Sequence, residues 1–322
     1  MASIVLITGA NGFIGSYTTL LFESQGDRVV AIDVMPRSND LSLLPIRTAT
    51  TILDVTDSIG LRELCKKEKV THIIHAAHPH REENPEVLNF CLQAMRNLLE
   101  AAKEGGVKRV VFSSSGAVYG PIKTEEHRPI KEDDPVGIYP TFLYRSAKIL
   151  GESLGDFYAE HHGLSFVSLR YSSVYGPGET RGIGLSIKEG ILGKPCRIYL
   201  TRVPDDLIFV KDVARAIRIA SFHEQPVSRA FNIACGRAYF VSDLQEAMRK
   251  HLPEVSLEMG KPPDLATVNR FRQRDILDVT RAREELGFVP QFDLDSGIAA
   301  IVEWVRTEKK RLKGGRNETS AL

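Results

Sequence analysis

Two side chains four residues apart, Tyr144 and Lys148, are the pair in this sequence best suited to acid–base chemistry. They fall in a stretch with helical periodicity, where residues i and i+4 lie on the same face. A free phenol has a pKa near ~10 and is a poor base at neutral pH, but a neighbouring ammonium stabilises the phenolate and lowers that pKa. Tyr144 could then accept a proton from an alcohol, or donate one to a ketone. On its own, such a pair more often lies on the protein surface without a catalytic role.

A serine-rich segment supplies the third candidate. Residues 112–120 read Phe-Ser-Ser-Ser-Gly-Ala-Val-Tyr-Gly, which begins as a buried strand and ends in small residues. A serine at the carboxyl end of a strand in an α/β sheet points into the ligand crevice. The Ser115 hydroxyl could therefore hold a substrate oxygen beside Tyr144. The alternative is a hydroxyl that only satisfies a turn.

A glycine-rich turn near the N-terminus indicates which ligand accompanies these side chains. Residues 6–16 read Leu-Ile-Thr-Gly-Ala-Asn-Gly-Phe-Ile-Gly-Ser, with an apolar run before the turn and an apolar helical pattern after it. Gly9 permits the tight turn, Gly12 lets the backbone approach phosphates, and Gly15 lets the helix pack against the strand. The free N–H groups and the dipole at the helix start then face an anion. This order of elements predicts a dinucleotide pyrophosphate site.

Asp33 and Arg37 bear on which dinucleotide binds. Asp33 ends a second apolar run, residues 28–32, at the distance where an acid grips the adenine ribose. Its carboxylate accepts hydrogen bonds from ribose hydroxyls and repels a 2′-phosphate, which favours NAD over NADP. Arg37 leaves NADP as an alternative cofactor, because a nearby arginine could bind that 2′-phosphate.

The elements expected to position these residues alternate through the first 175 residues. Strand-like runs lie at 4–7, 28–32, 50–53, 72–75, 109–113 and 165–170, and helical patterns at 14–24, 58–68, 85–104 and 140–161. Most of the strands are apolar throughout, as in a parallel sheet covered on both faces. We therefore predict an α/β fold in which residues 1–175 form a Rossmann-type, doubly wound parallel sheet that binds NAD.

The regular alternation of strand-like and helical segments ends after Gly176, where glycine and proline residues interrupt it. Helical patterns resume at 212–223, 242–251 and 295–307, and Ser242 with Gln245 predicts a capping box. We expect residues 176–312 to form a smaller mixed α/β substrate lobe, threaded partly back into the first domain. Residues 313–322 are most simply a flexible tail.

The composition excludes several classes of function. The chain has 322 residues, 43% hydrophobic and 26% charged, with a formal net charge of +1, which argues against nucleic acid as a partner. Its four cysteines form no CxxC and fit a reducing compartment. The first expected strand begins near residue 3 and no apolar run approaches ~18 residues, so we expect no signal peptide, no membrane partner and a cytoplasmic location.

Seven motifs, spread from Ile4 to about Pro290, resemble those of the extended short-chain dehydrogenase/reductase family, in its NAD-dependent epimerase/dehydratase group. They are the glycine segment 8–15, Asp54-Val55, His75-Ala76-Ala77, the serine segment 113–120, Tyr144 to Lys148, residues 169–171 with 174–178, and residues 286–290. The resemblance implies that Ser115, Tyr144 and Lys148 are catalytic and that the cofactor is NAD.

The resemblance also implies a set of cofactor contacts and an oligomeric state. The residues expected to bind NAD are Gly9, Asn11, Gly12, Phe13, Ile14, Gly15, Asp33, Asp54, Val55, Ala76, Ala77, Tyr144, Lys148, Tyr171, Ser172 and Val174. Members of the family are commonly dimers through two helices, here 85–104 and 140–161. We therefore expect a homodimer.

Departures from the family pattern narrow the activity. Nucleotide-sugar 4,6-dehydratases usually carry an acid pair where this chain has Gly116 and Ala117, and the related decarboxylases keep a glutamate at the second position. Neither residue here is ionisable. We therefore set both activities aside.

Two further departures concern the substrate. Nucleotide-sugar 4-epimerases usually have an asparagine where Ser173 stands and an arginine where Asp205 stands. A carboxylate beside a diphosphate is unfavourable, although Arg202 or Arg270 could compensate. These departures favour a substrate that is not diphosphate-linked.

Four histidines fall within nine residues: His72, His75, His78 and His80. A metal site is disfavoured because the first two belong to a strand and no acid or cysteine at ligand spacing joins them until Glu82. We expect no bound metal. Instead, His78, His80 and Arg81 could line the mouth of the crevice for a small anionic or polyhydroxylated substrate, or they could form only a solvated loop.

The leading interpretation is a NAD-dependent oxidoreductase acting reversibly on a secondary alcohol or ketone. The substrate would be a small molecule such as a sugar, sugar acid or similar hydroxy compound, with contacts at His78, His80, Ser115, Ser173 and Arg270. One alternative is a UDP-sugar 4-epimerase that keeps NAD tightly bound. Another is a non-enzymatic NAD-binding regulator, because fold does not dictate function.

Overall fold

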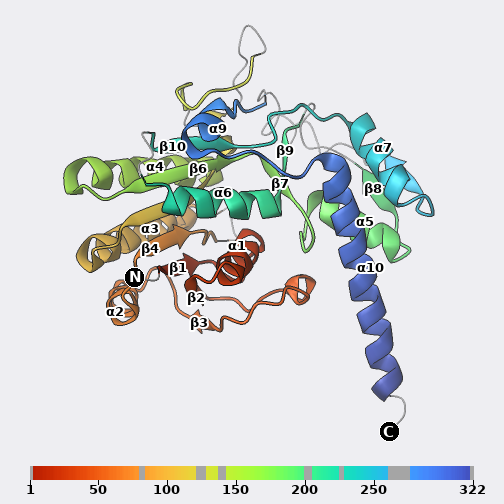
Figure 1. Ribbon diagram of the computed structural model, residues 1–322, viewed down its shortest axis with the longest axis horizontal. Coiled ribbons are helices and arrows are strands. Elements are labelled where there is room, and N and C mark those ends of the chain that lie inside the picture. Colours follow the sequence, from red (N-terminus) through yellow and green to blue (C-terminus); the bar gives the residue numbers. More distant parts are fainter. Residues whose placement is uncertain are drawn as a thin grey trace.

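A parallel sheet organises the molecule. The computed structural model describes residues 3–79, 84–120, 128–136, 143–198, 205–224, 228–259 and 276–319. Within these ranges, seven parallel strands form one sheet in the order β10-β6-β5-β4-β1-β2-β3 (Figure 1). Their bounds are β1 Ile4–Thr8, β2 Arg28–Asp33, β3 Thr50–Ile52, β4 His72–His75, β5 Arg109–Ser115, β6 Phe166–Tyr171 and β10 Ala230–Ile233. The strand order reverses between β1 and β4, which confirms the predicted doubly wound α/β sheet.

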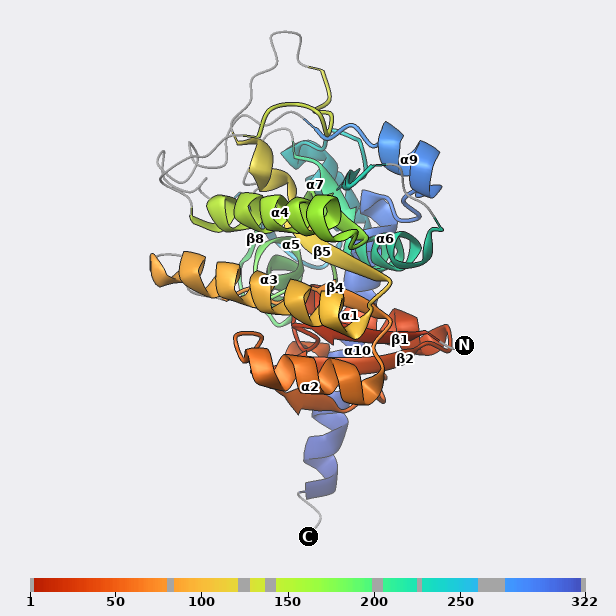
Figure 2. The same ribbon diagram turned by 90° about the vertical axis from the view of Figure 1, so that its left-hand side faces the viewer.

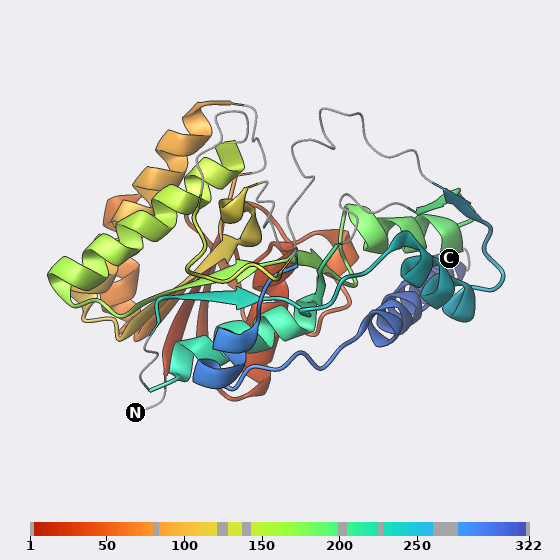
Figure 3. The same cartoon turned by 90° about the horizontal axis from the view of Figure 1, so that it is seen from above.

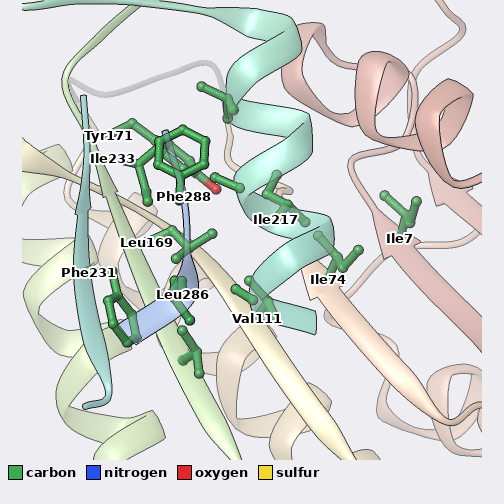
Figure 4. Close-up of a cluster of buried hydrophobic side chains, with 14 of the residues drawn as sticks. Ile7, Ile74, Val111, Leu169, Tyr171, Ile217, Phe231, Ile233, Leu286 and Phe288 are labelled. Atoms are coloured by element: carbon green, nitrogen blue, oxygen red, sulfur yellow. The ribbon is translucent and has the colours of Figure 1, made fainter. Parts of the chain in front are cut away.

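Helices cover both faces of this sheet (Figures 2 and 3). One face carries α1, Phe13–Ser24, and α6, Val210–Phe222; the other carries α2, Ser58–Glu68, α3, Glu86–Gly105, and α4, Leu143–His162. Apolar side chains of the strands point toward the helices on both faces of the sheet. Figure 4 shows those on the face of α1 and α6, where they pack against Ile217 of α6. Burial on both sides explains why the strands read as continuous apolar runs.

The last strand of the sheet comes from the second half of the chain. Ile233 of β10 pairs in parallel with Tyr171 of β6. Helix α9, Thr280–Leu286, packs beside β10, and Leu286 and Phe288 complete the cluster in Figure 4. This strand was not expected from the sequence, because a four-residue segment carries little periodicity.

A smaller group of elements adjoins the carboxyl ends of the strands. It contains β7 Ser173–Tyr175 paired with β9 Leu207–Phe209, β8 Cys196–Ile198 paired with β11 Leu257–Met259, and helices α5 Gly182–Ile191, α7 Val241–His251 and α10 Leu294–Thr319. These helices share a third apolar core, which includes Ile187, Met248 and Ile298. Helix α10 extends beyond the rest of the molecule (Figures 1 and 2). None of the described helices is long and apolar enough to cross a membrane.

Helix α7 begins earlier than the sequence pattern predicts. It starts at Val241, and the backbone N–H of Phe240 donates to the Asp243 carboxylate at 2.7 Å. Ser242 lies inside the helix, so the predicted capping box of Ser242 and Gln245 is wrong. An aspartate near the helix start satisfies an unpaired N–H and complements the helix dipole.

Candidate active site

The glycine turn joins β1 to α1 with almost no free space. Gly9 has a φ of +69°, and a Cβ there would lie 2.7 Å from the Ala77 backbone. A Cβ on Gly15 would lie 2.0 Å from the carbonyl oxygen of Gly9. A Cβ on Gly12 would have only that same oxygen within 4 Å, at 3.2 Å. Gly9 and Gly15 are therefore required by packing, whereas Gly12 keeps the outer side of the turn open to a ligand.

The start of α1 is suited to an anion. Gly12 is the N-cap residue, and its carbonyl accepts the N–H of Ser16 at 2.9 Å. No side chain caps this terminus, and the first turn holds no acidic residue. The backbone N–H groups at Phe13 and Ile14 and the positive end of the helix dipole fit a pyrophosphate.

Asp33 lies beside this turn, at the end of β2. One carboxylate oxygen accepts the N–H of Asn11 at 3.0 Å and the other accepts the N–H of Met35 at 2.9 Å. The Asn11 side chain donates to the Met35 carbonyl at 2.7 Å and accepts from the Thr50 hydroxyl at 2.8 Å. These bonds fix the glycine turn against the carboxyl end of β2 and the first residue of β3. They also place a carboxylate where the fold positions an adenine ribose.

The other expected cofactor residues follow the carboxyl ends of neighbouring strands. Asp54 and Val55 follow β3, Ala76 and Ala77 follow β4, and Tyr171, Ser172 and Val174 lie at the end of β6 or just beyond it. The N–H groups of Ala76 and Ala77 donate to the carbonyl and hydroxyl of Thr8, at 3.2 and 3.3 Å. The structure therefore brings the expected cofactor residues to one edge of the sheet, at the point where the strand order reverses.

The tyrosine–lysine pair meets β5 at this edge. Lys148 is buried, and its ammonium donates to the carbonyl of Ser113 at 2.7 Å. The same ammonium lies 5.5 Å from the ring centroid of Tyr144. The Tyr171 hydroxyl lies 3.2 Å from the Ser113 hydroxyl, and burial holds the pKa of Tyr171 far above its usual range. Tyr144 is therefore a phenol whose ring lies within reach of the lysine charge, whereas Tyr171 is held in its neutral form.

Ser115 is the last residue of β5, two residues beyond the expected strand end. Its Oγ accepts the N–H of Ala117 at 3.1 Å, so the hydroxyl does satisfy a turn. A hydroxyl has one hydrogen and two lone pairs, and accepting this bond leaves the hydrogen available. Ser115 can therefore cap the turn and also donate to a substrate oxygen.

His75 is a buried histidine close enough to Lys148 to feel its charge. Burial lowers the pKa of His75 to about 3, and the charge of Lys148 acts in the same direction. Its Nδ1 lies 2.8 Å from the Thr8 hydroxyl, and its ring stacks on Phe112. At neutral pH the imidazole carries no charge, so it does not compete with the ammonium for a phenolate.

His78 lies directly against Tyr144. The two rings meet edge to face with centroids 4.8 Å apart, and the His78 Nδ1 lies 3.8 Å from the Sγ of Cys91 on α3. Cys91 was not among the site residues expected from the sequence. Its helical spacing from the buried Met95 and Leu98, at i+4 and i+7, is the signal that places it on the inner face.

The two departures from the epimerase pattern bond to each other. The Ser173 hydroxyl donates to the Asp205 carboxylate at 2.9 Å, and the N–H of Asp206 donates to the same oxygen at 3.0 Å. Asp205 is only 3% exposed. Other expected or compensating residues, His80, Arg81, Arg202 and Arg270, lie outside the described residues.

Within the described ranges, no group of three or more His, Cys, Asp or Glu side chains is placed to hold a metal ion.

Comparison with known proteins identifies the family. The profile of the NAD dependent epimerase/dehydratase family matches residues 5–234. The chain belongs to this family, and is accordingly an enzyme of a NAD-dependent class. The resemblance drawn from the motifs is confirmed.

The similar proteins include several sugar epimerases. UDP-glucuronate 4-epimerase 1 of Arabidopsis thaliana is 28% identical over 337 residues, covering 93% of this chain and 76% of the relative. A UDP-glucose 4-epimerase of Thermotoga maritima, solved with UDP-glucose, has a TM-score of 0.83 and 25% identity, covering 95% of this chain and 99% of its own. The Thermus thermophilus UDP-glucose 4-epimerase, solved with NAD, has a TM-score of 0.80 and 25% identity, covering 94% and 99%.

Proposed function

We propose that this enzyme is a NAD-dependent 4-epimerase of a UDP-linked sugar. The observation that carries the proposal is the contact of Lys148 with both Ser113 and the Tyr144 ring, at the edge of the sheet that holds the glycine turn. The names of the similar proteins support the epimerase over the dehydrogenase that the sequence analysis ranked first.

The glycine turn and Asp33 would hold the cofactor. The open side of Gly12 and the start of α1 suit its pyrophosphate, and the Asp33 carboxylate suits an unphosphorylated ribose. Arg37, the residue that keeps NADP open, is half-buried and interacts electrostatically with Glu23. NAD, when bound, supplies a reversible hydride acceptor.

The side chains of this site would move and hold the proton at the sugar C4 oxygen. Tyr144 would accept that proton as the alcohol becomes a ketone, and the Lys148 ammonium would stabilise the resulting phenolate. The Ser115 hydroxyl would donate a hydrogen bond to the same oxygen and fix its position. If the ketone rotates in the site and presents its other face, hydride returns to that face and Tyr144 would return the proton to the oxygen. The product is then the C4 epimer, with no net redox change.

The test is a direct assay of epimerisation with a matched pair of variants. The purified protein should interconvert UDP-glucose with UDP-galactose, or UDP-glucuronate with its C4 epimer, without added nucleotide. Tyr144→Phe should lower kcat by about 10²–10⁴-fold. Tyr158→Phe, fourteen residues further along α4 with its hydroxyl on Glu100, should leave kcat within about twofold.

Denaturation should release close to one NAD(H) per chain, because an epimerase has no need to exchange its cofactor. Absence of turnover with every UDP-sugar tried would contradict the proposal. Turnover that survives Tyr144→Phe would contradict the assigned role of the phenol.

A second candidate rests on the Ser173–Asp205 hydrogen bond. A buried carboxylate at this place disfavours a diphosphate and is compatible with the hydroxyl groups of a free sugar or sugar acid. In that case the protein would be a dehydrogenase that purifies without nucleotide. It would then form one NADH for each sugar or sugar acid oxidised.

A further inference from the structure

The loop that carries His78 is anchored on the main chain of the sheet. The two residues before it, Ala76 and Ala77, both donate their backbone N–H groups to Thr8 at the end of β1. The Gly9 backbone, directly after Thr8, also packs tightly against Ala77. The Cα of His78 therefore has little freedom, and its ring is directed by a fixed backbone.

The His78 ring has contacts on two further elements. Its Nδ1 lies 3.8 Å from the Cys91 Sγ on α3, and its ring lies 4.8 Å from that of Tyr144 on α4, at an interplanar angle of 88°. This is the edge-to-face arrangement that two aromatic rings prefer. His78 thus links the loop after β4 to both helices that pack side by side on this face of the sheet.

Tyr144 needs such a contact because its proposed chemistry depends on staying near Lys148. The lysine follows four residues later, on the same face of α4. The Lys148 ammonium lies 5.5 Å from the ring centroid. A phenol that swung away by a rotamer would leave the ammonium and lose the stabilisation of its charged form.

We infer that His78 is a positioning residue, which holds the Tyr144 ring in the orientation where the Lys148 ammonium stabilises its phenolate. The inference rests on the proposed role of Tyr144 as acid and base. His78 acts through Tyr144 and is given no contact with the sugar or the cofactor. The ring shape of His78, and not a charge on the imidazole, is what the position requires.

Three variants test this inference by kinetics. His78→Ala removes the ring and should lower kcat about tenfold, with KM changed by less than about twofold, while the acid limb of the kcat–pH profile moves to higher pH. His78→Phe keeps an aromatic edge and should recover kcat to within about threefold of the parent. Cys91→Ala removes the second contact of the imidazole and should fall between the two.

A second readout needs no turnover. In the NAD-loaded protein without substrate, the phenolate absorbance of Tyr144 is obtained by subtracting the titration of Tyr144→Phe. Burial holds the pKa values of Tyr17, Tyr171 and Tyr175 far above the usual range, so these phenols stay outside the window. The Tyr144 titration should move to higher pH in His78→Ala and return in His78→Phe.

The outcomes separate this inference from the proposed function. If no UDP-sugar is turned over but the absorbance shifts as expected, the positioning role stands and the substrate assignment fails. An unchanged Tyr144 titration and kcat profile in His78→Ala would overturn the inference. Failure of His78→Phe to rescue would also overturn it, since a property of the imidazole other than its aromatic edge would then be required. Should His78→Ala not fold, the Cys91→Ala titration decides: a partial shift of Tyr144 to higher pH supports the inference, and an unchanged titration overturns it.

Discussion

Backbone groups hold the key polar side chains of the site in single orientations. The Lys148 ammonium is fixed by a carbonyl of β5, the Ser115 hydroxyl by a turn N–H, and the Asp33 carboxylate by the N–H of Asn11. A side chain bonded to the main chain of a sheet loses its rotamer freedom during folding, before any ligand arrives. The reacting geometry is therefore largely set by secondary structure.

Gly9 is the residue whose replacement should be most damaging. In Gly9→Ala the new Cβ would lie 2.7 Å from the Ala77 backbone, and φ would stay at +69°. Because the atoms that this Cβ would meet are main-chain atoms of Ala76 and Ala77, relief requires the ends of β1 and β4 to separate. We expect a loss of about 3 kcal/mol or more in the free energy of unfolding, measured in urea, together with loss of NAD binding measured by titration.

Gly26→Ala is the matched control for this prediction. Gly26 also has a positive φ, +81°, but a Cβ there would meet nothing within 4 Å. It should cost only the backbone strain, about 1 kcal/mol, and leave NAD affinity unchanged. Equal costs at the two positions would show that the close approach to Ala77 contributes nothing.

The buried His75 should make the protein sensitive to acid. Its pKa is lowered from 6.5 to about 3 in the folded chain by burial and by the charge of Lys148. Between these two pH values the unfolded chain binds a proton that the folded chain does not. The free energy of unfolding is therefore fully retained above pH 6.5 and falls as the pH drops toward 3.

Unfolding in urea at a series of pH values measures this slope. In His75→Gln the slope between these pH values should be shallower than in the parent, because the variant has no imidazole to protonate. The exposed His161 provides the control, and His161→Gln should keep the parent slope. A slope unchanged in His75→Gln would assign the acid sensitivity to other groups.

Among the elements, those that alternate regularly along the first 175 residues were predictable from sequence, and the short strands after them were not. Strands β1 to β6, the short β3 and β4 included, follow from runs that alternate with helical patterns. Strands β8, β9, β10 and β11 have three or four residues each, lie where this alternation has ended, and depend on pairing with segments far away in the chain.

The candidate site divides in the same way. The glycine turn, Ser115, Tyr144 and Lys148 could be identified because each has a distinctive residue type at a fixed place in an element. The pairing of Ser173 with Asp205 joins residues 32 positions apart, and no local pattern in the sequence reports that contact. The contact of His78 with Cys91 across a loop and a helix is of the same kind.

A buried ion pair fixes α4, the helix of Tyr144 and Lys148, to the sheet. Arg170 of β6 binds Glu152 of α4 through two nitrogens, with the shortest contact at 2.7 Å, and also donates to the Tyr119 hydroxyl at 2.9 Å. Both charged side chains are less than 10% exposed. Removing one partner leaves the other charge buried and unpaired, which costs more than removing both.

Arg170→Leu should therefore lower the free energy of unfolding by about 3–5 kcal/mol, and the double variant Arg170→Leu/Glu152→Leu should recover part of that loss. Lys250→Met, which removes a surface pair with Asp295, should cost less than about 1 kcal/mol. Urea unfolding of the parent and the three variants measures each of these losses in the free energy of unfolding. A double variant less stable than Arg170→Leu would contradict the argument.

At the scale of the whole molecule, polar contacts tie the sheet to the smaller group of elements. Lys188 of α5 forms ion pairs with Asp40, in the segment between β2 and β3, and with Glu308 of α10. The Tyr17 hydroxyl of α1 donates to the carbonyl of Pro177 at 2.8 Å. These contacts fix the position of the segment after β7 relative to the glycine turn. A site that is built from both segments requires this fixed position.

The remaining expectation at this scale is a homodimer through α3 and α4. These helices pack side by side on one face of the sheet, and α4 presents Phe157 with half of its surface exposed. If a second chain packs on these helices, Phe157 is the aromatic side chain that the interface would bury, and aromatic side chains are often the residues on which binding depends most. Phe157→Glu should raise the Kd of the dimer at least about tenfold, measured by light scattering after size-exclusion chromatography over a dilution series.

Phe240→Glu is the matched control, because Phe240 is 47% exposed but precedes α7, outside both helices. A parent chain that is monomeric throughout, or an equal effect of both variants, would contradict assembly through α3 and α4.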